Sequence, residues 1–386
     1  MGWETEVVRH RRALHEIPEL GFEEHETQAY LETALSKLGI EWKPVAGTGL
    51  VAEIAGQGRR AVAVRADMDG LPLDEESGEP FSSRHPGRMH ACGHDGHMAI
   101  LLALAERLCA EPPPGRVRLL FQPAEERPPG GALRLIAEGA LEGVDEVLGL
   151  HLWATDPLGV VAMRAGPIMA NADQFFARIE GQGGHGSAPH ETQDAVVIAA
   201  ETVLHLQTVV SRRVPPLEPA VVSVGTLHAG RVFNAIADHA EISGTVRTLS
   251  DAVQALVETE VRRAVEGVAA LYGARATFRY ERGYPAVVNH QAVVDRWQRA
   301  LGDRFQVVAA EPKLTGEDFA YYLRVRPGAY CFLGARPEGQ AHPHHSARFR
   351  LHEAALPMGV EVLYRGVLAA LAEGSGAGSG MRQGLA

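Results

Sequence analysis

The sequence of 386 residues predicts a mixed α/β protein in which a larger domain, built on a mixed and mainly parallel sheet, is interrupted by a smaller domain. Two observations support this. Short apolar runs with strand character alternate with helical runs over most of the chain, which is typical of βαβ units. Between residues 173 and 282 the order changes to strand, helix, strand, strand, helix, strand, a split βαβ unit that can close by itself.

The first half of the chain is expected to consist of helices and strands bounded by Gly, Pro or charged residues. The helix that ends near Ala110 has the clearest stop, because three prolines follow it at 112–114. In chain order the predicted elements are helical spacing over 5–38 broken at Pro18, strands at 49–55 and 61–66, a helix at 94–110, a strand at 117–122, a helix at 132–139 and a strand at 146–153.

The chain changes character after Gly166, where we expect the smaller domain to be inserted. The insertion is predicted over 169–283, the larger domain over 1–168 and 284–375, and a flexible Gly/Ser tail over 376–386. Inside the insertion the predicted elements are strands at 173–180, 219–228, 238–247 and 275–282 and helices at 194–211 and 251–273. Beyond it they are helices at 290–302 and 353–372, a helix opening at Gly316, and strands at 306–310 and 329–333.

Composition and charge exclude several classes of partner. The net charge of −11 is a poor match to a phosphate backbone, so nucleic acid is not an expected partner. No apolar run approaches the roughly 20 residues that a bilayer span needs, so no membrane association is expected. Three far-separated cysteines, and an N-terminal segment without the apolar core of a signal peptide, are typical of a protein of the reducing cytoplasm.

Candidate metal ligands gather where predicted strands end. The segment 90–97, HACGHDGH, lies directly before an apolar helix, and its Cys92 and His94 flank a glycine, so that a thiolate and an imidazole can reach one ion. Glu125 and Glu126 follow another predicted strand. Adjacent side chains in an extended chain point to opposite sides, so these two carboxylates can serve different roles, one on a metal and one on a substrate or water.

Two further groups of histidines complete the set. His151 stands near the end of a predicted strand, and His342, His344 and His345 lie in the loop before the closing helix. Each group alone has an ordinary structural explanation. Together they place sulfur, nitrogen and oxygen donors at the carboxyl edge of one sheet, where open α/β sheets build their sites. The donors outnumber the ligands of one tetrahedral zinc and suit a pair of cations bridged by a water.

The ordered set of motifs resembles the M20 metallopeptidases, and more narrowly the amidohydrolase branch that includes hippurate hydrolases, indole-acetyl-amino-acid hydrolases and N-acyl-amino-acid deacetylases. The resemblance covers about residues 5–372. It implies that an inserted, ferredoxin-like domain covers a di-metal site as a lid and mediates homodimerisation. The motifs that carry the resemblance are RADMD (65–69), HACGHDGH (90–97), QPAEE (122–126), GLHLW (149–153), GGHGSAPH (183–190), GEDF (316–319) and His345-x-x-x-Phe349.

The resemblance also implies a role for each site residue. Glu125 would be the general base, and Asp67 would orient a histidine ligand. The spacing to Phe349 favours His345 over the fallback His344, although Ala347 stands where many relatives have Pro. The expected cations are two Zn²⁺, with Mn²⁺, Co²⁺ or Ni²⁺ as alternatives. The residues that match the family's metal ligands are Cys92, His94, Glu126, His151 and His345.

Three residues of the insertion match substrate-binding positions of the family. His185 would donate to the oxyanion, often across a dimer interface, and Asn234 and Arg247 would hold the carboxylate end of the substrate. The resemblance thus implies hydrolysis of N-acyl-amino acids to a carboxylic acid and an amino acid. A dipeptidase or carboxypeptidase with the same centre is the first alternative. A non-catalytic metal- or ligand-binding protein and a structural zinc site with a redox cysteine are the others.

Overall fold

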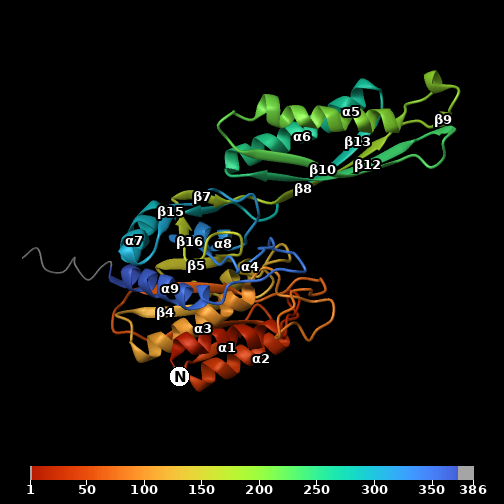
Figure 1. The fold of residues 1–386 in the computed structure, drawn as a ribbon. Coiled ribbons are helices and arrows are strands. Elements are labelled where there is room, and N and C mark those ends of the chain that lie inside the picture. The colour runs from red at the N-terminus through yellow and green to blue at the C-terminus, as the bar shows by residue number, and fades with distance from the viewer. Residues whose placement is uncertain (1, 373–386) are drawn as a thin grey trace, which may run out of the picture. The chain divides into compact units, whose positions relative to one another are not determined.

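The computed structural model describes residues 2–372, which form two compact units (Figure 1). The first unit comprises residues up to 168 together with 288–311 and the chain from 318, and the second comprises 169–287 with 312–317. The second unit therefore extends four residues beyond the predicted insertion and also takes in a later segment that the sequence analysis assigned to the larger domain. The predicted tail at 376–386 lies outside the described residues.

The first unit is built on a mixed sheet in which the central strands are parallel. β4 and β5 pair with β3 in parallel, and β16 pairs with β5 in parallel, whereas β2 and β6 are antiparallel to their neighbours β4 and β16. This confirms the predicted fold class. In spatial order the strands are β1 (Trp42–Val45), β2 (Gly49–Ile54), β4 (Arg116–Gln122), β3 (Ala61–Asp67), β5 (Glu146–Trp153), β16 (Gly328–Gly334), β6 (Val161–Met163) and β15 (Val307–Ala309).

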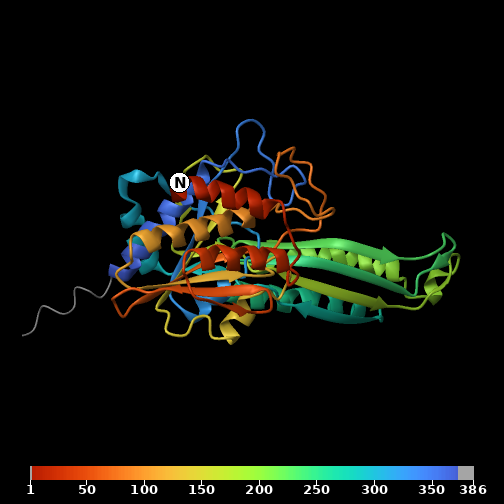
Figure 2. The same cartoon turned by 90° about the horizontal axis from the view of Figure 1, so that it is seen from below.

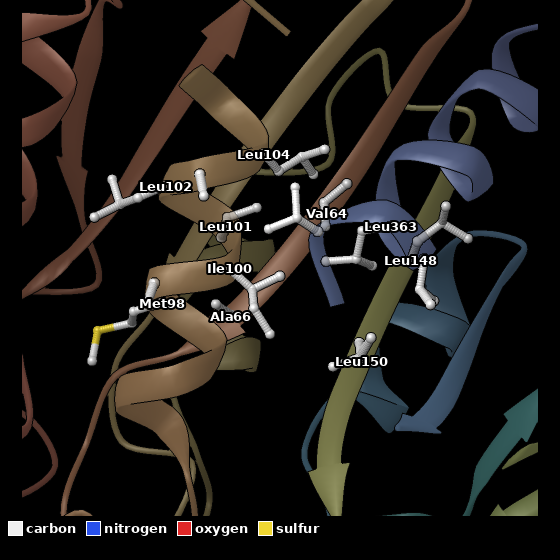
Figure 3. Packing of buried hydrophobic residues seen from close by; sticks show 14 of the residues in the cluster. Val64, Ala66, Met98, Ile100, Leu101, Leu102, Leu104, Leu148, Leu150 and Leu363 are labelled. Carbon is white, nitrogen blue, oxygen red and sulfur yellow. The ribbon is translucent and has the colours of Figure 1, made fainter. Parts of the chain in front are cut away.

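Helices cover this sheet and bury its apolar side chains. Val64 and Ala66 of β3 and Leu148 and Leu150 of β5 pack against the faces of α3 and α9 (Figure 3). Every residue of α3 from His94 to Ala105 is buried, because α1 covers the side of α3 that faces away from the sheet. The helices are α1 (Trp3–His15), α2 (His25–Lys37), α3 (His94–Ala110), α4 (Ala132–Ala137), α7 (Gln291–Leu301), α8 (Ala320–Val325) and α9 (Ala355–Ala372).

The opposite face of the sheet carries a buried polar network. Because side chains alternate along a strand, Arg65 points away from α3, and its guanidinium donates to Gln122 at 2.9 Å and to Asp318 at 2.8 Å. The Tyr322 hydroxyl of α8 donates to the same Gln122 side chain at 3.0 Å. Asp318 also accepts the N–H of Ala132 at the start of α4. Both faces of the sheet are therefore covered.

The second unit is a four-stranded antiparallel sheet with α5 and α6 on one face (Figures 1 and 2). The strand order is β10-β12-β8-β13, so the first and last strands of the unit are neighbours, as in a split βαβ unit. Val257, Val261 and Val265 of α6 belong to the same buried cluster as Phe175 and Ile179 of β8. The elements are β8 (Asp173–Glu180), α5 (Ala195–Thr208), β10 (Ala220–Ala229), β12 (His239–Thr248), α6 (Asp251–Leu271) and β13 (Arg275–Glu281).

The expected helix opening at Gly316 is wrong, since α8 begins only at Ala320. Asp318 could have capped a helix, but its carboxylate accepts from Arg65, Gln122 and Ala132 instead. The sequence analysis also missed several short strands of two to four residues. In addition to β1 and β6, these are β7 (Gly166–Met169), β9 (Gly184–His185), β11 (Ala235–Ile236) and β14 (Val287–Asn289).

Two helices of the described chain are long and apolar enough to cross a membrane by length and composition, which the sequence analysis did not anticipate. They are Ala195–Arg213 and Ala355–Ala372, and 33% and 61% of their most apolar windows are buried inside the protein. The second of these, α9, packs on β5 and α3 in the core of the first unit. A mostly buried core helix passes the same test, so the two helices are weak evidence for a membrane span.

Candidate metal centre

The centre of the first unit lies where three parallel strands end. β3 ends at Asp67, β4 ends at Gln122 just before Glu125, and His151 lies near the end of β5. These strands run in the same direction, so their carboxyl ends meet at one edge of the sheet, the edge at which α/β proteins build sites. The prediction that these motifs share an edge is consistent with this register.

Cys92 and His94 are presented by a tight turn at the start of α3. Gly93 between them has a φ of +94°, a left-handed conformation that glycine adopts without steric cost. The Nδ1–H of His94 donates to the carbonyl oxygen of Asp69 at 2.9 Å, which leaves Nε2 to bind an ion that displaces its proton. That Nε2 is buried and has no hydrogen-bond partner among the described residues.

His151 is held in the same way. Its Nδ1–H donates to the carbonyl oxygen of Leu152 at 2.8 Å, and its Nε2 lies 3.6 Å from the Sγ of Cys92. Burial, together with the neighbouring His97, holds the pKa of His151 well below its usual value, so the imidazole is neutral. A neutral ring with one nitrogen fixed by a backbone carbonyl offers the other nitrogen to a metal ion.

Glu126 and His345 close the group from two other segments. The Oε1 of Glu126 lies 2.9 Å from the Nε2 of His345 and 4.0 Å from the Nε2 of His94. His345 has a φ of +64°, and its N–H donates to the carbonyl oxygen of Ala91 at 2.9 Å. A non-glycine residue in this strained conformation has to be held by the surrounding contacts.

The donor atoms lie close enough together to share metal ions. Five groups of three described residues have all ligand atoms within 4.8 Å of one another. Three of these groups overlap, so that five residues form one continuous cluster with Glu125 at its border. These three groups are Cys92 with His94 and His151, Cys92 with Glu126 and His345, and His94 with Glu125 and Glu126.

The chemistry of this cluster fits a pair of divalent cations. The Nε2 of His94 is buried without a hydrogen-bond partner in the described chain, a costly state unless a ligand binds there. Burial and the nearby Glu126 and Glu125 carboxylates raise the pKa of the Cys92 thiol well above its usual value. Thiol, imidazole and carboxylate donors together suit Zn²⁺ and neighbouring transition metals, whose charge reverses such a shift.

Glu125 lies at the border of the cluster and is only 7% exposed. Its backbone N–H donates to Asp69 Oδ1 at 3.0 Å, and the N–H of Glu126 donates to Asp69 Oδ2 at 2.9 Å. Sequence reasoning missed Asp69 as a site residue, although it is the last residue of the RADMD motif. It orients His94 through its carbonyl and holds the Glu125–Glu126 turn through its carboxylate.

Asp67 makes no direct hydrogen bond to a candidate ligand within the described residues. It was expected to orient a histidine ligand, but the Oδ2 of Asp67 is 3.6 Å from the Nε2 of His94, and Asp69 orients that ring instead. Asp67 accepts from the Nδ1–H of His97 at 2.6 Å and from Arg65 at 2.7 Å. Burial would raise the pKa of Asp67, but His94, His97 and Arg65 hold it well below its usual value.

Two histidines of the 342–345 loop, His344 and His345, have different partners. His345 faces Glu126, whereas the Nε2–H of His344 donates to the carbonyl oxygen of Leu152 at 3.1 Å. The ring of His344 also lies 4.5 Å from that of Trp153, centroid to centroid. The geometry therefore supports His345 as the candidate ligand and gives the fallback His344 a packing role.

Two of the three expected substrate-binding residues lie together in the second unit. β9 pairs with β11, the Gly186 N–H donates to the carbonyl oxygen of Asn234 at 2.9 Å, and His185 stands opposite Ala235. The Ser187 N–H donates to the Nδ1 of His185, so that Nε2 carries the proton of the neutral ring. His185 is exposed and can donate this proton in a hydrogen bond.

Arg247 lies far from this pair within the unit. It stands near the end of β12, eight residues from His239 at the β11 side, which is about 26 Å along an extended strand. Within one copy of this unit, Asn234 and Arg247 therefore do not lie side by side. The Nη1 of Arg247 donates to the carbonyl oxygen of Asp173, and its Nε and Nη2 make no hydrogen bond with described residues.

A mixed α/β unit with thiol, imidazole and carboxylate donors at the carboxyl edge of its sheet, and a carboxylate beside them, defines the class of metal-dependent hydrolases. The comparison with known proteins agrees with that class. Residues 63–369 match the peptidase family M20/M25/M40, and the chain belongs to this family.

Individual relatives cover nearly the whole chain. N-acetyl-L-cysteine deacetylase of Bacillus subtilis is 40% identical over 366 residues, covering 94% of this chain and 87% of the relative. Thermostable carboxypeptidase 2 of Saccharolobus solfataricus is 41% identical over 364 residues and covers 92% of both chains. A dinuclear metal-binding M20 peptidase of Bacillus subtilis has a similar solved structure, with a TM-score of 0.85, 34% identity, and coverage of 96% of this chain and 99% of that one.

Proposed function

We propose that this protein hydrolyses the amide bond of N-acyl-amino acids, releasing a carboxylic acid and a free amino acid. The observation that carries the proposal is the position of Glu125 beside the candidate metal ligands. Its carboxylate lies within 4.8 Å of ligand atoms of His94 and Glu126. Relatives such as the deacetylase of N-acetyl-L-cysteine support an acylated amino acid as the substrate. The second named relative, a carboxypeptidase, favours small peptides as the alternative substrate class.

Five residues would hold two divalent cations: Cys92, His94, Glu126, His151 and His345. When bound, the cations would polarise the amide carbonyl and lower the pKa of a bound water from about 15.7 towards 7. Zn²⁺ is the first expectation from the thiol and imidazoles, and Mn²⁺, Co²⁺ or Ni²⁺ also suit a site with a carboxylate.

The side chains of the protein would carry the proton transfers. Glu125 accepts a proton from the water while the water oxygen attacks the carbonyl carbon. It then delivers that proton to the leaving amine as the C–N bond breaks. His185 donates from Nε2 to the developing oxyanion, an interaction typically worth roughly 3–4 kcal/mol. The unpartnered Nε and Nη2 of Arg247 form a fork that suits a carboxylate.

The test is Glu125→Gln, which keeps the shape of the side chain and removes the base. We expect full metal content and a loss of several orders of magnitude in turnover of an N-acetyl-amino acid, since a positioned base contributes about 10²–10⁴-fold. Turnover close to that of the wild type would refute the proposal. Comparing N-acetyl, N-benzoyl and indole-acetyl amino acids with an unblocked dipeptide would separate the amidohydrolase from the peptidase.

We also propose a cytoplasmic homodimer formed through the second unit, which would act as a lid. The support is the separation of Arg247 from the His185–Asn234 pair within one unit, because two copies can bring such groups to one substrate. Sedimentation equilibrium would test it: a monomer at micromolar concentration with full activity would refute the dimer.

A further inference from the structure

The turn that carries Glu125 has an unusual backbone. Ala124 has a φ of +55°, in the left-handed region that residues with a side chain rarely adopt, and it directly precedes the proposed base. A turn in this conformation needs contacts that over-determine it. The backbone amides of 124–126 supply them, because each donates to a buried carboxylate from another part of the chain.

Asp69 accounts for two of the three amides, and Glu24 accounts for the remaining one. The Oε1 of Glu24 accepts the N–H of Ala124 at 2.8 Å, although the two residues are 100 positions apart. Glu24 is 0% exposed, and its Oε2 accepts from the Thr48 hydroxyl at 2.5 Å. The carboxylate is therefore fixed at both oxygens, one towards the turn and one towards the loop before β2.

The segment that carries Glu24 packs directly on the turn. A Cβ on Gly21 would lie 2.8 Å from the Cβ of Ala124, which is closer than real contacts allow. Only a glycine permits this approach of the 18–24 segment. Glu24 reaches the turn through the main-chain amide of Ala124, so this contact acts on Glu125 through the backbone of the turn.

We propose that Glu24 is a positioning residue of the hydrolase, which fixes the left-handed turn at Ala124 and thereby aims Glu125. This inference rests on the proposed role of Glu125 as the base. Burial and the nearby Asp69 carboxylate raise the pKa of Glu24 to about 7. Either protonation state keeps Oε1 as an acceptor for Ala124, because the proton can sit on Oε2 and be donated to Thr48.

A glutamine reproduces these contacts, with its carbonyl oxygen accepting from Ala124 and its amide donating to Thr48. We therefore expect Glu24→Gln to turn over substrate at close to the wild-type rate. Glu24→Ala withdraws the acceptor, and Glu24→Asp shortens the side chain by one methylene and keeps the charge. For both we expect kcat to fall roughly 10- to 100-fold with KM and metal content little changed, as a misplaced catalytic group does.

Glu19 provides a matched control in the same segment. It is also buried, and its carboxylate accepts the N–H groups of Glu26 and Thr27 at the start of α2, without a contact to the turn. Glu19→Ala should lower the melting temperature but leave kcat per folded molecule unchanged. Hydrogen exchange supplies a readout besides activity: the amides of 124–126 should lose protection in Glu24→Ala and Glu24→Asp, but not in Glu19→Ala.

The outcomes separate the two proposals. If Glu125→Gln is inactive while Glu24→Asp and Glu24→Ala keep the wild-type kcat and amide protection, the positioning role is overturned and the proposed function stands. If Glu125→Gln is active, the proposed function fails whatever the Glu24 variants do. If Glu24→Ala does not fold, Glu24→Asp decides, and equal losses of kcat in Glu24→Gln and Glu24→Asp would also overturn the inference.

Discussion

The Nδ1 of His97 lies 2.6 Å from Oδ1 of Asp67, and both residues are buried. The other ring nitrogen of His97 accepts the backbone N–H of Leu152 at 2.9 Å, so the imidazole links the end of β3 to the end of β5. Leu152 is the neighbour of His151, and its carbonyl oxygen accepts from that ring. Asp67 thus acts on a candidate ligand through His97 and the backbone of β5.

Asp67→Asn should therefore weaken metal binding without removing a ligand. Replacing an outer partner of this kind typically costs 10- to 100-fold in metal affinity, and we expect a loss of about that size. Competition with a fluorescent chelator measures it. Asp145→Asn is the control, because Asp145 accepts the N–H of Ala61 at the opposite end of β3 and should leave the affinity unchanged. Equal affinities in both variants would contradict the role given to Asp67.

His345→Ala and His344→Ala should have opposite effects on metal content and on stability. His345 is 52% exposed at its side chain and faces Glu126, so we expect lower metal content and a change of roughly 0.5 kcal/mol or less in metal-free stability. His344→Ala removes a half-buried donor from the carbonyl of Leu152, which still accepts from His151, and should cost about 0.5–1.5 kcal/mol with the metal content kept. Metal analysis and urea unfolding would distinguish the two, and the reverse pattern would make His344 the ligand.

Removing the metal should loosen the centre and leave the second unit unchanged. A cation at 100 times its dissociation constant stabilises the folded protein by about 2.7 kcal/mol, so chelation should lower the melting temperature by several degrees. Hydrogen exchange should rise at the amides of 92–97 and 124–126. α6 of the second unit serves as the internal control, and exchange that rises equally there would indicate global unfolding instead.

A buried ionic group at the end of α1 should make stability depend on pH. The two ring nitrogens of His15 lie 2.8 Å from Asp95 and 3.0 Å from Glu75. Burial alone would lower the pKa of His15, but the effect of Asp95 and Glu75 is larger and raises the pKa above its usual value. Burial would raise the pKa of Glu75, but the hydrogen bonds from His15 and Ser77 lower it to about 2.

The signs define a pH window. The depressed Glu75 contributes stability above its unfolded pKa of 4.5, and this is lost as the pH falls towards 2. The raised His15 contributes below its unfolded pKa of 6.5, and this is lost as the pH rises through the folded value. The stability difference between wild type and Glu75→Gln should therefore be largest, roughly 1–2 kcal/mol, between pH 4.5 and 6.5. Glu76→Gln, which removes an exposed ion pair with Arg348, should show no such maximum.

The elements and the donors could be predicted because they depend on local patterns. The apolar runs of β3, β4 and β5 were visible in the sequence, and a parallel sheet brings their carboxyl ends to one edge. Contacts made by backbone groups leave no comparable pattern of residue types in the sequence. Glu24 meets Ala124 across 100 residues, and Asp69 acts mainly on main-chain amides, so neither role could be predicted from the sequence.

Distances along an extended strand could not be predicted from the spacing of residues in the sequence. Asn234 and Arg247 are 13 residues apart, which is compatible with neighbouring side chains in a compact loop. Because β12 runs without interruption from His239 to Thr248, it separates them instead. Whether such a segment folds back or stays extended depends on its pairing with β8 and β10, which is decided by residues far away in the chain.

The pairing of β8 with β13 has a consequence for how proteins of this domain arrangement can evolve. Gln174, in the strand that opens the second unit, stands opposite Glu281, in the strand that closes it, so more than a hundred residues depart and return at adjoining positions. Hydrogen-bonded antiparallel partners have Cα atoms only about 5.5 Å apart. A domain whose two ends lie this close together can be inserted, deleted or exchanged at one site in the chain, and the strand order of the central sheet would not change.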